Sequence, residues 1–227
     1  MDKCENESTH KIKVDPASVI PNHAICRKTE EEAIAEENSK LNATRWNNWN
    51  RLVGERGKRY EDCRLRNYTV NSPEQQNSVN RLTEYLDSIE KRIEGGEGLL
   101  LFGPKGCGKD HLLMACARVA IGHDFKVQWL NGMDLFARLR GAMDPDAYDT
   151  EESIFHELRK PRILWISDPA PPTGSLTEYQ QSFLFRLLDY RYSHLLTTWV
   201  CCNVTSGADL DARIGAQNGD RLRHGAH

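Results

Sequence analysis

The stretch GLLLFGPKGCGKDHLLMACA, residues 98–117, decides the fold of this chain. It opens with the apolar run 98–103, turns through closely spaced glycines, and continues into the largely apolar run 110–121. A strand without polar residues is typical of a sheet covered on both faces, and closely spaced glycines allow the backbone to turn tightly. The stretch therefore predicts a buried strand, a tight loop and a helix in succession.

The same alternation extends to both sides of this stretch. Upstream, Ser72 is a candidate N-cap for a helix that starts at Pro73 and ends at Gly95-Gly96. Downstream, apolar strands alternate with helices. We expect strands at 125–131, 162–167 and 197–204, and helices at 133–143, 152–159 and 178–193. Because helices separate the strands, the predicted fold class is α/β, a three-layer αβα domain with a parallel sheet.

Composition excludes several classes of protein. The 227 residues carry a formal net charge of -3, which provides no overall attraction to nucleic acid or anionic membranes. No apolar run reaches the length of a membrane helix, and the polar N-terminus lacks the apolar core of a secretion signal. We therefore expect a cytoplasmic protein in which Cys116, Cys201 and Cys202 are reduced thiols of the core.

A change of character near residue 57 predicts two parts. Residues 28–56 are highly charged with sparse apolar positions, which indicates an exposed helix or helix pair. Residues 1–56 are accordingly predicted as an N-terminal, partner-binding extension that is largely helical or partly disordered. Residues 57–227 are predicted to form the α/β domain.

Residues 103–110 fit the pattern G-x-x-x-x-G-K followed by a small polar residue, between a strand and a helix. In such a loop, backbone N–H groups and the helix N-terminus surround phosphate, and Lys109 adds a positive charge. The alternative is a glycine-rich turn without a ligand. We predict that the loop binds ATP through these residues: Gly103, Pro104, Lys105, Gly106, Cys107, Gly108, Lys109, Asp110 and His111.

Two carboxylates are candidate Mg²⁺ ligands. Asp110 stands where the pattern usually has Ser or Thr. Its carboxylate can bind Mg²⁺ but also repels phosphate, or alternatively it favours the first turn of the helix. Asp168 ends the predicted strand 162–167, where P-loop domains keep the metal-holding acid; the alternative is a turn residue. Pro169 follows and cannot accept a proton. Hydrolysis is therefore weak, or another group such as Asp110 or Glu178 acts as the base.

Together these motifs resemble the IstB/DnaC-type AAA+ ATPases, from about residue 57 to the C-terminus. The segment KRYEDCRLRNY (58–68) is similar to the family's opening segment, and 97–117 is similar to its Walker A region. The segment DPAPPTGSLTEYQQSFLFRLLDYRY (168–192) is similar to the Walker B region and the following helix. The family comprises bacterial replicative-helicase loaders and transposition helper ATPases.

The resemblance implies roles for two more residues. Asn203, in TTWVCCNV, would be the sensor 1 residue that faces the γ-phosphate, and Arg221 would be an arginine finger, with Arg213 and Arg223 as rivals. Asp168, Asn203 and Arg221 are therefore the candidate catalytic residues. In the family, a further strand and a sensor 2 arginine usually follow the finger. Since the sequence stops at His227, either it is truncated there or the domain lacks them.

The resemblance also implies a function: a DNA replication helicase loader or similar adaptor that binds ATP and Mg²⁺. Its partners would be a replicative helicase or other DNA-acting protein, further copies of itself assembled through ATP, and single-stranded DNA. One alternative is a nucleotide-gated binding module with little hydrolysis, and another is a transposition helper ATPase. A small-molecule kinase shares the phosphate loop but needs a lid and an acceptor pocket that are not evident.

The N-terminal part leaves two further features open. Cys4, His10, His23 and Cys26 offer the ligands of a Cys₂His₂ metal site, although their irregular spacing favours no metal. A second group combines positive charge with aromatic rings, which suits packing on the core or contact with single-stranded DNA. For the segment near Arg59 and Tyr60, the family resemblance implies a third possibility, a place beside the adenine pocket. Its members are Arg45, Trp46, Trp49, Arg51, Arg56, Lys58, Arg59 and Tyr60.

Overall fold

The computed structural model describes the backbone of residues 22–144 and 146–226, with side chains from residue 31 onward. The chain divides into two compact units, residues 1–42 and residues 43–227. Helix α1 (Asn22–Arg56) contributes residues to both units. Its residues 31–44 are exposed, as expected for a charged helix, and Lys40 and Glu36 form an ion pair one turn apart at 2.8 Å.

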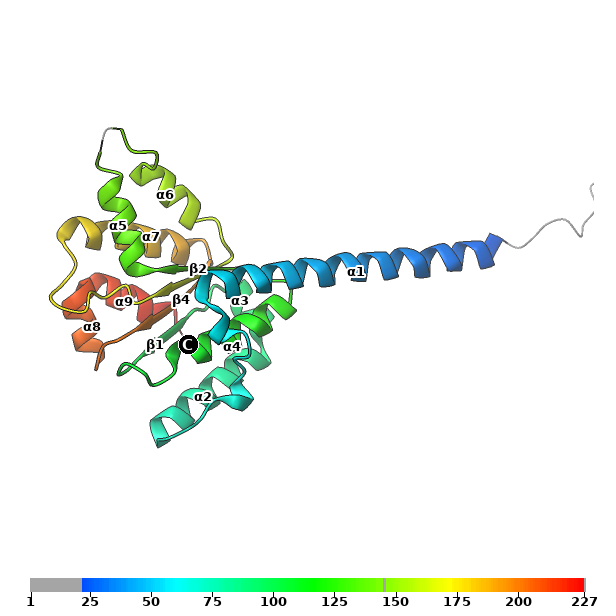
Figure 1. The fold of residues 1–227 in the computed structure, drawn as a ribbon, viewed down its shortest axis with the longest axis horizontal. Coiled ribbons are helices and arrows are strands. Elements are labelled where there is room, and N and C mark those ends of the chain that lie inside the picture. The colour runs from blue at the N-terminus through cyan, green and yellow to red at the C-terminus, as the bar shows by residue number, and fades with distance from the viewer. Residues whose placement is uncertain (1–21, 145, 227) are drawn as a thin grey trace, which may run out of the picture. The chain divides into compact units, whose positions relative to one another are not determined.

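The second unit is built on a four-stranded parallel sheet (Figure 1). Its strands are β1 (Leu99–Phe102), β2 (Val127–Asn131), β3 (Ile163–Ser167) and β4 (Thr197–Cys202). They lie in the order β1-β4-β3-β2, so that β4 is inserted between the strands that precede it in the chain. The structure thus confirms the four strands that the sequence predicts. It also confirms the predicted αβα architecture with a parallel sheet.

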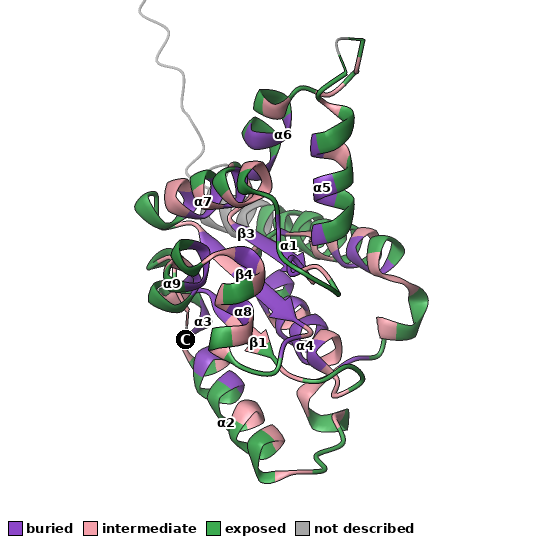
Figure 2. Cartoon of the chain, turned by 90° about the vertical axis from the view of Figure 1, so that its left-hand side faces the viewer, coloured by how far each residue is buried: buried purple, intermediate pink, exposed green. Residues whose placement is uncertain are grey.

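Helices cover both faces of the sheet and divide the core in two. Alternate strand residues point to opposite sides: Leu99, Trp165 and Trp199 belong to one cluster, and Ile166 and Val200 to the other. The first face is covered by the end of α1 and by helices α2 (Pro73–Asp87), α3 (Ile89–Glu94) and α4 (Lys109–Gly122). The second face is covered by α5 (Gly132–Gly141), α6 (Glu151–Leu158), α7 (Glu178–Ser193), α8 (Gly207–Ile214) and α9 (Ala216–His224). Figure 2 shows the resulting buried strands between helices whose outer faces are exposed.

Two expectations upstream of the sheet need correction. The helix predicted from Pro73 to Gly95 is two helices, because Ser88 adopts φ -131° and ψ 33° and separates α2 from α3. Its predicted start is confirmed, since the Ser72 side chain accepts a hydrogen bond from the Gln75 N–H. The end of α1 is not an exposed element: Trp49, Leu52 and Val53 are buried against the sheet.

Short 3-10 helices and a terminal bridge complete the unit. The helices η2 (Lys58–Tyr60) and η3 (Leu65–Asn67) lead from α1 to α2. At the other end, Gly98 forms an isolated parallel bridge with Ala226, and its N–H donates to the Gly225 carbonyl at 2.5 Å. Within residues 22–144 and 146–226, no helix is both long and apolar enough to cross a membrane.

Candidate nucleotide-binding site

The predicted site residues meet where parallel strands end. The glycine loop follows β1, Asp168 follows β3 and Asn203 follows β4, and ligands of open α/β sheets bind beyond these carboxyl ends. A cavity of about 390 Å³ opens there. Its lining comprises Arg59, Tyr60, Cys63, Gly106, Gly108, Lys109, Asp110, His111, Asp168, Cys201 and Asn203.

The glycine loop has the geometry of an anion-binding turn. Gly108 is the N-cap of α4 and has φ 89°, a left-handed conformation that favours glycine. A Cβ at this position would lie 2.5 Å from the Tyr68 ring. The Tyr68 hydroxyl in turn donates to the Cys107 carbonyl at 2.5 Å. Tyr68 therefore supports the loop from behind, a role that the sequence pattern alone does not indicate.

Lys109 is held at the centre of the loop. Its side chain is buried, and Nζ donates to the carbonyls of Gly103 and Pro104 at 2.9 Å each. The third partner is Oδ1 of Asn203, at 2.8 Å. A buried ammonium must have such partners, and a phosphate oxygen could replace them without moving the lysine out of the cavity.

Asn203 connects Lys109 to Asp168. Its backbone N–H and its Nδ2 both donate to Oδ1 of Asp168, at 3.1 Å and 2.7 Å. Asp168 adopts φ 50°, and its N–H donates to the Cys201 carbonyl of the neighbouring strand at 2.7 Å. The three residues thus form one hydrogen-bonded chain across the ends of β3 and β4 and the start of α4.

Burial raises the pKa of the Asp168 carboxyl above its ordinary value, and the nearby charge of Asp110 raises it further. The Lys109 ammonium, the backbone hydrogen bond from Asn203 and the Arg56 guanidinium oppose this rise. Two carboxylates therefore face one cavity, and two cations offset them.

The environment of Asp110 does not match the usual Mg²⁺ site of a P-loop. The hydroxyl is absent, and the carboxylate that replaces it forms an ion pair with Arg56, while its Oδ1 lies 3.5 Å from the Cys201 thiol. Mg²⁺ prefers near-octahedral oxygen ligands and retains most of its waters. A guanidinium on the same carboxylate competes with such an ion by charge and by position. The donor set at Asp110 thus fits Mg²⁺ poorly, and the sequence-based expectation of Mg²⁺ at Asp110 and Asp168 stays a prediction.

The opening segment of the domain forms the opposite wall of the cavity. Arg59 and Tyr60 line it, and their place beside adenine stays a prediction. Trp49 packs in the core, whereas Trp46 is 61% exposed. His111 is fixed to this segment through Nε2, which lies 2.9 Å from the Arg64 carbonyl and 3.0 Å from Oδ1 of Asn67.

The candidate arginine finger lies outside this cavity. Arg221, on α9, forms an ion pair with Asp189 at 2.7 Å and stacks on Tyr192, with its guanidinium 4.7 Å from the ring centre. The rival candidates are also paired within the chain, Arg213 with Asp209 and Arg223 with Asp211. Arg221 therefore does not line the nucleotide cavity of its own chain, and its role as an arginine finger stays a prediction.

Glu178 does not reach the phosphate loop either. It lines a separate cavity of about 440 Å³ with residues 215–218 at the start of α9. Of the two substitutes considered for the missing base, only Asp110 lines the nucleotide cavity.

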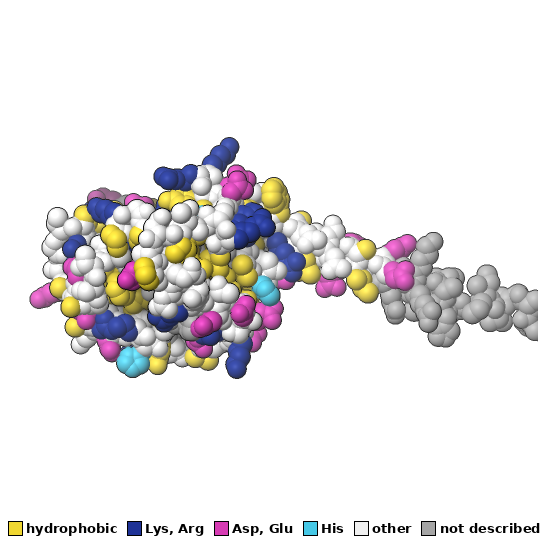
Figure 3. Space-filling model, turned by 90° about the horizontal axis from the view of Figure 1, so that it is seen from below, with side chains coloured by type: hydrophobic (Ala, Val, Ile, Leu, Met, Phe, Trp, Pro, Cys, Tyr) yellow, Lys and Arg dark blue, Asp and Glu magenta, His cyan; other side chains and the backbone are white. Residues whose placement is uncertain are grey.

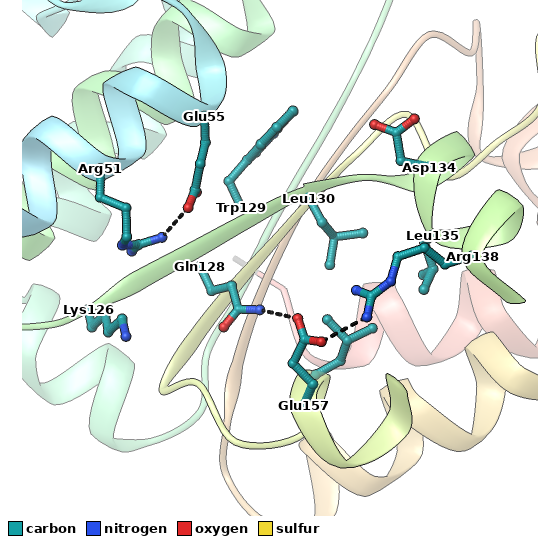
Figure 4. A pocket seen from close by; sticks show the side chains of 11 residues that line it. Arg51, Glu55, Lys126, Gln128, Trp129, Leu130, Asp134, Leu135, Arg138 and Glu157 are labelled. Atoms are coloured by element: carbon teal, nitrogen blue, oxygen red, sulfur yellow. Dashed lines mark hydrogen bonds and ion pairs between the residues drawn. The ribbon is translucent and has the colours of Figure 1, made fainter. Parts of the chain in front are cut away.

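A further cavity of about 350 Å³ lies against the edge strand β2 (Figure 4). Four of its charged side chains form two ion pairs: Arg51 contacts Glu55 at 2.7 Å, and Arg138 contacts Glu157 at 2.9 Å. The Arg51 guanidinium also donates to the Val127 carbonyl at 2.6 Å. These contacts hold the end of α1 to β2 and α5 to α6, which is a structural role.

The remaining sequence-based expectations concern cysteines and metal. Cys116, Cys201 and Cys202 are buried free thiols, as expected, and burial raises the pKa of the Cys116 thiol to about 12. Cys4 and His10 lie outside the described residues, as do the side chains of His23 and Cys26. In the described part of the chain, no three His, Cys, Asp or Glu residues gather into a metal site.

A phosphate loop, a strand-end aspartate and a strand-end asparagine on a parallel sheet in the order β1-β4-β3-β2 define a P-loop NTPase domain. Residues 58–227 match the model of the family described as IstB-like ATP binding protein, and the chain belongs to this family. It is thus an IstB/DnaC-type AAA+ ATPase by family and by fold. A protein of Geobacillus stearothermophilus described as an ATP-binding protein of insertion sequence IS5376 is 30% identical over 105 residues. The matched segment covers 45% of this chain and 39% of that protein.

Solved structures share the fold. The DnaC helicase loader superposes with a TM-score of 0.64 at 21% identity, over 75% of this chain and 97% of the loader chain. DnaI has a TM-score of 0.59 at 19% identity, with 75% and 88% covered. The replication initiator DnaA, bound to AMPPCP and single-stranded DNA, has a TM-score of 0.57 at 17% identity, with 72% and 48% covered.

Proposed function

We propose that this chain binds ATP in the cavity at the ends of β1, β3 and β4 and acts as an adaptor for a DNA-acting protein. The carrying observation is the hydrogen-bonded chain from Lys109 through Asn203 to Asp168, set against the glycine loop. This chain brings together the Lys109 ammonium, which can bind phosphates, the Asn203 amide, which can contact the γ-phosphate, and the Asp168 carboxylate. Occupancy by nucleotide must break the bonds of Lys109, and so it changes the contacts of Asn203.

The sharpest test of the site is ATP affinity in Lys109→Ala. We expect the substitution to lower the affinity by at least about 10-fold, because it removes the one ammonium inside the loop. Lys91→Ala is the matched control, since Lys91 is exposed on α3 and remote from the cavity lining. The measurement is a titration with a fluorescent ATP analogue; equal affinities for the two variants would refute the site.

For the partner, we propose a replicative helicase. The structures of DnaC and DnaI, a helicase loader and its relative in fold, support this choice through the shared architecture. On the face of residues 43–227 that Figure 3 shows, basic side chains lie among acidic and apolar ones. Such a mixture suits a protein partner better than the phosphate backbone of DNA, which requires a continuous basic stripe.

A transposition helper is the second candidate. It is supported by the IstB-like family and by the insertion-sequence protein of Geobacillus stearothermophilus. The two functions differ in their partner, so the discriminating measurement is ATP-dependent binding to a purified replicative helicase and, in parallel, to the transposase of an insertion sequence. Binding of neither partner in the presence of ATP would contradict the adaptor function.

The cytoplasm remains the proposed location, and single-stranded DNA and further copies of the chain remain proposed partners. Turnover is proposed to be weak. The residue that usually activates water is replaced by Pro169, and Glu178 faces a different cavity. Binding of ATP, rather than its hydrolysis, would then set the state of the adaptor.

A further inference from the structure

An ion pair beside the phosphate loop joins two elements far apart in sequence. Arg56, the last residue of α1, contacts Asp110 in the first turn of α4. Both side chains are largely shielded from water, with 17% and 29% of their surface exposed. In such a setting an ion pair is screened less by solvent than one on the surface.

Aromatic rings keep the guanidinium of Arg56 in this place. It lies 4.5 Å from the centre of the Tyr60 ring and 5.2 Å from that of Trp129. Its Nε is buried and has no hydrogen-bond partner within the described structure. The cation is therefore positioned mainly by Asp110 and by these aromatic rings.

The balance of charges around the cavity indicates what Arg56 does. The cavity is lined by two carboxylates, Asp110 and Asp168, and by two cations, Lys109 and Arg59. An unpaired Asp110 carboxylate would disfavour a polyphosphate, because it lies at the start of the helix that should attract the phosphates. Arg56 cancels the charge of Asp110 at the position where other P-loops use a hydroxyl and a metal ion.

We propose that Arg56 is a positioning residue of the nucleotide site, which holds and neutralises the Asp110 carboxylate so that the phosphate loop binds a polyphosphate without Mg²⁺ at that position. This inference rests on the proposed binding of ATP and concerns how the same cavity achieves it. Arginine suits the role because its planar guanidinium keeps its charge at all physiological pH values and can donate two parallel hydrogen bonds to a carboxylate. The consequence is nucleotide binding that tolerates removal of Mg²⁺.

The test compares the affinity for a fluorescent ATP analogue in excess Mg²⁺ and in EDTA, using the full chain. For the wild type we expect the two affinities to agree within about 3-fold. Asp110→Thr restores the usual hydroxyl and should make Mg²⁺ improve the affinity by more than about 10-fold. Arg56→Gln should weaken binding in EDTA by about 10-fold.

Arg45→Gln is the matched control, because Arg45 lies on the same helix and also pairs with an aspartate, Asp124, at 2.7 Å, away from the cavity. It should bind the analogue as the wild type does. Arg56→Lys, which keeps the charge without the planar fork, should retain more affinity than Arg56→Gln, and equal melting temperatures of the two variants would show that folding is not the cause.

Three results would count against these claims, and they are distinguishable. A wild type that loses more than about 10-fold in affinity in EDTA overturns the role of Arg56 but leaves ATP binding intact. Equal behaviour of Arg56→Gln and Arg45→Gln also overturns it. A wild type that binds the analogue in neither buffer refutes the proposed function, and the inference fails with it.

Discussion

At the scale of single residues, two positions set the chemistry of the cavity. Asp110 places a carboxylate where a hydroxyl is usual, and Pro169 follows the strand-end Asp168 where a base is usual. Pro169 is buried and lies close to Gly132, where an added Cβ would come within 2.4 Å of the Pro169 Cα. The loop after β3 is therefore packed tightly against the start of α5, and a change at 169 projects into a confined space.

The residue-scale prediction is a gain of hydrolysis in Asp110→Thr/Pro169→Glu. The double variant should release phosphate about 10² times faster than the wild type in excess Mg²⁺, because it provides a hydroxyl ligand and a general base. Asp110→Thr/Pro169→Gln is the control, since glutamine has the size of glutamate but cannot take a proton. Phosphate release is measured at saturating ATP; equal rates in the two double variants would show that the missing base does not limit turnover.

At the scale of elements, α1 changes character along its length. Within the second unit, Trp46 is 61% exposed, whereas Leu52 is fully buried in the cluster that covers one face of the sheet. Arg51 of the same helix donates a hydrogen bond to the edge strand β2. The guanidinium of Arg118, on α4, stacks on Trp49 of α1 at 4.3 Å from the ring centre. The last turns of this helix therefore belong to the structural core of residues 43–227.

The element-scale prediction compares two truncations on this helix. Leu52→Ala should lower the free energy of unfolding by about 2–5 kcal/mol, because it leaves a cavity in the core. Trp46→Ala removes a larger but exposed side chain and should change it by less than about 0.5 kcal/mol. Urea unfolding followed by circular dichroism measures both; a small loss in Leu52→Ala would mean that the end of α1 contributes little to the core.

At the scale of the whole molecule, local and non-local features differ in how well the sequence predicts them. The four strands and the helix start at Ser72 follow from apolar runs and from capping chemistry, which are local. The pairing of Arg56 with Asp110 joins residues 54 positions apart in the chain (110 − 56), and no periodicity marks it. The unusual aspartate was the available signal, because a carboxylate beside a phosphate site requires a compensating cation. The break at Ser88 likewise depends on how two helices pack, which a helical pattern does not reveal.

The last prediction concerns assembly of several copies of the chain, and it rests on Arg221. Because its guanidinium is outside the cavity and paired with Asp189, a direct contact with the reacting phosphates requires the cavity of another copy. In the Asp110→Thr/Pro169→Glu background, we expect phosphate release per chain to rise with protein concentration and Arg221→Ala to reduce it at least about 10-fold. Arg223→Ala, which loses a comparable exposed ion pair with Asp211, should reduce it little.

Mixing then separates action in trans from a structural defect. In the same background, Lys109→Ala has an intact Arg221 but a disabled phosphate loop, and Arg221→Ala has the reverse. If the arginine of one copy stabilises the charge that develops on the phosphates of the next, an equimolar mixture must hydrolyse ATP faster than either variant alone. A mixture no faster than the sum of its parts would mean that Arg221 only supports α9 against α7 through Asp189, and the search for a finger would move to Arg213, whose ion pair with Asp209 lies on α8.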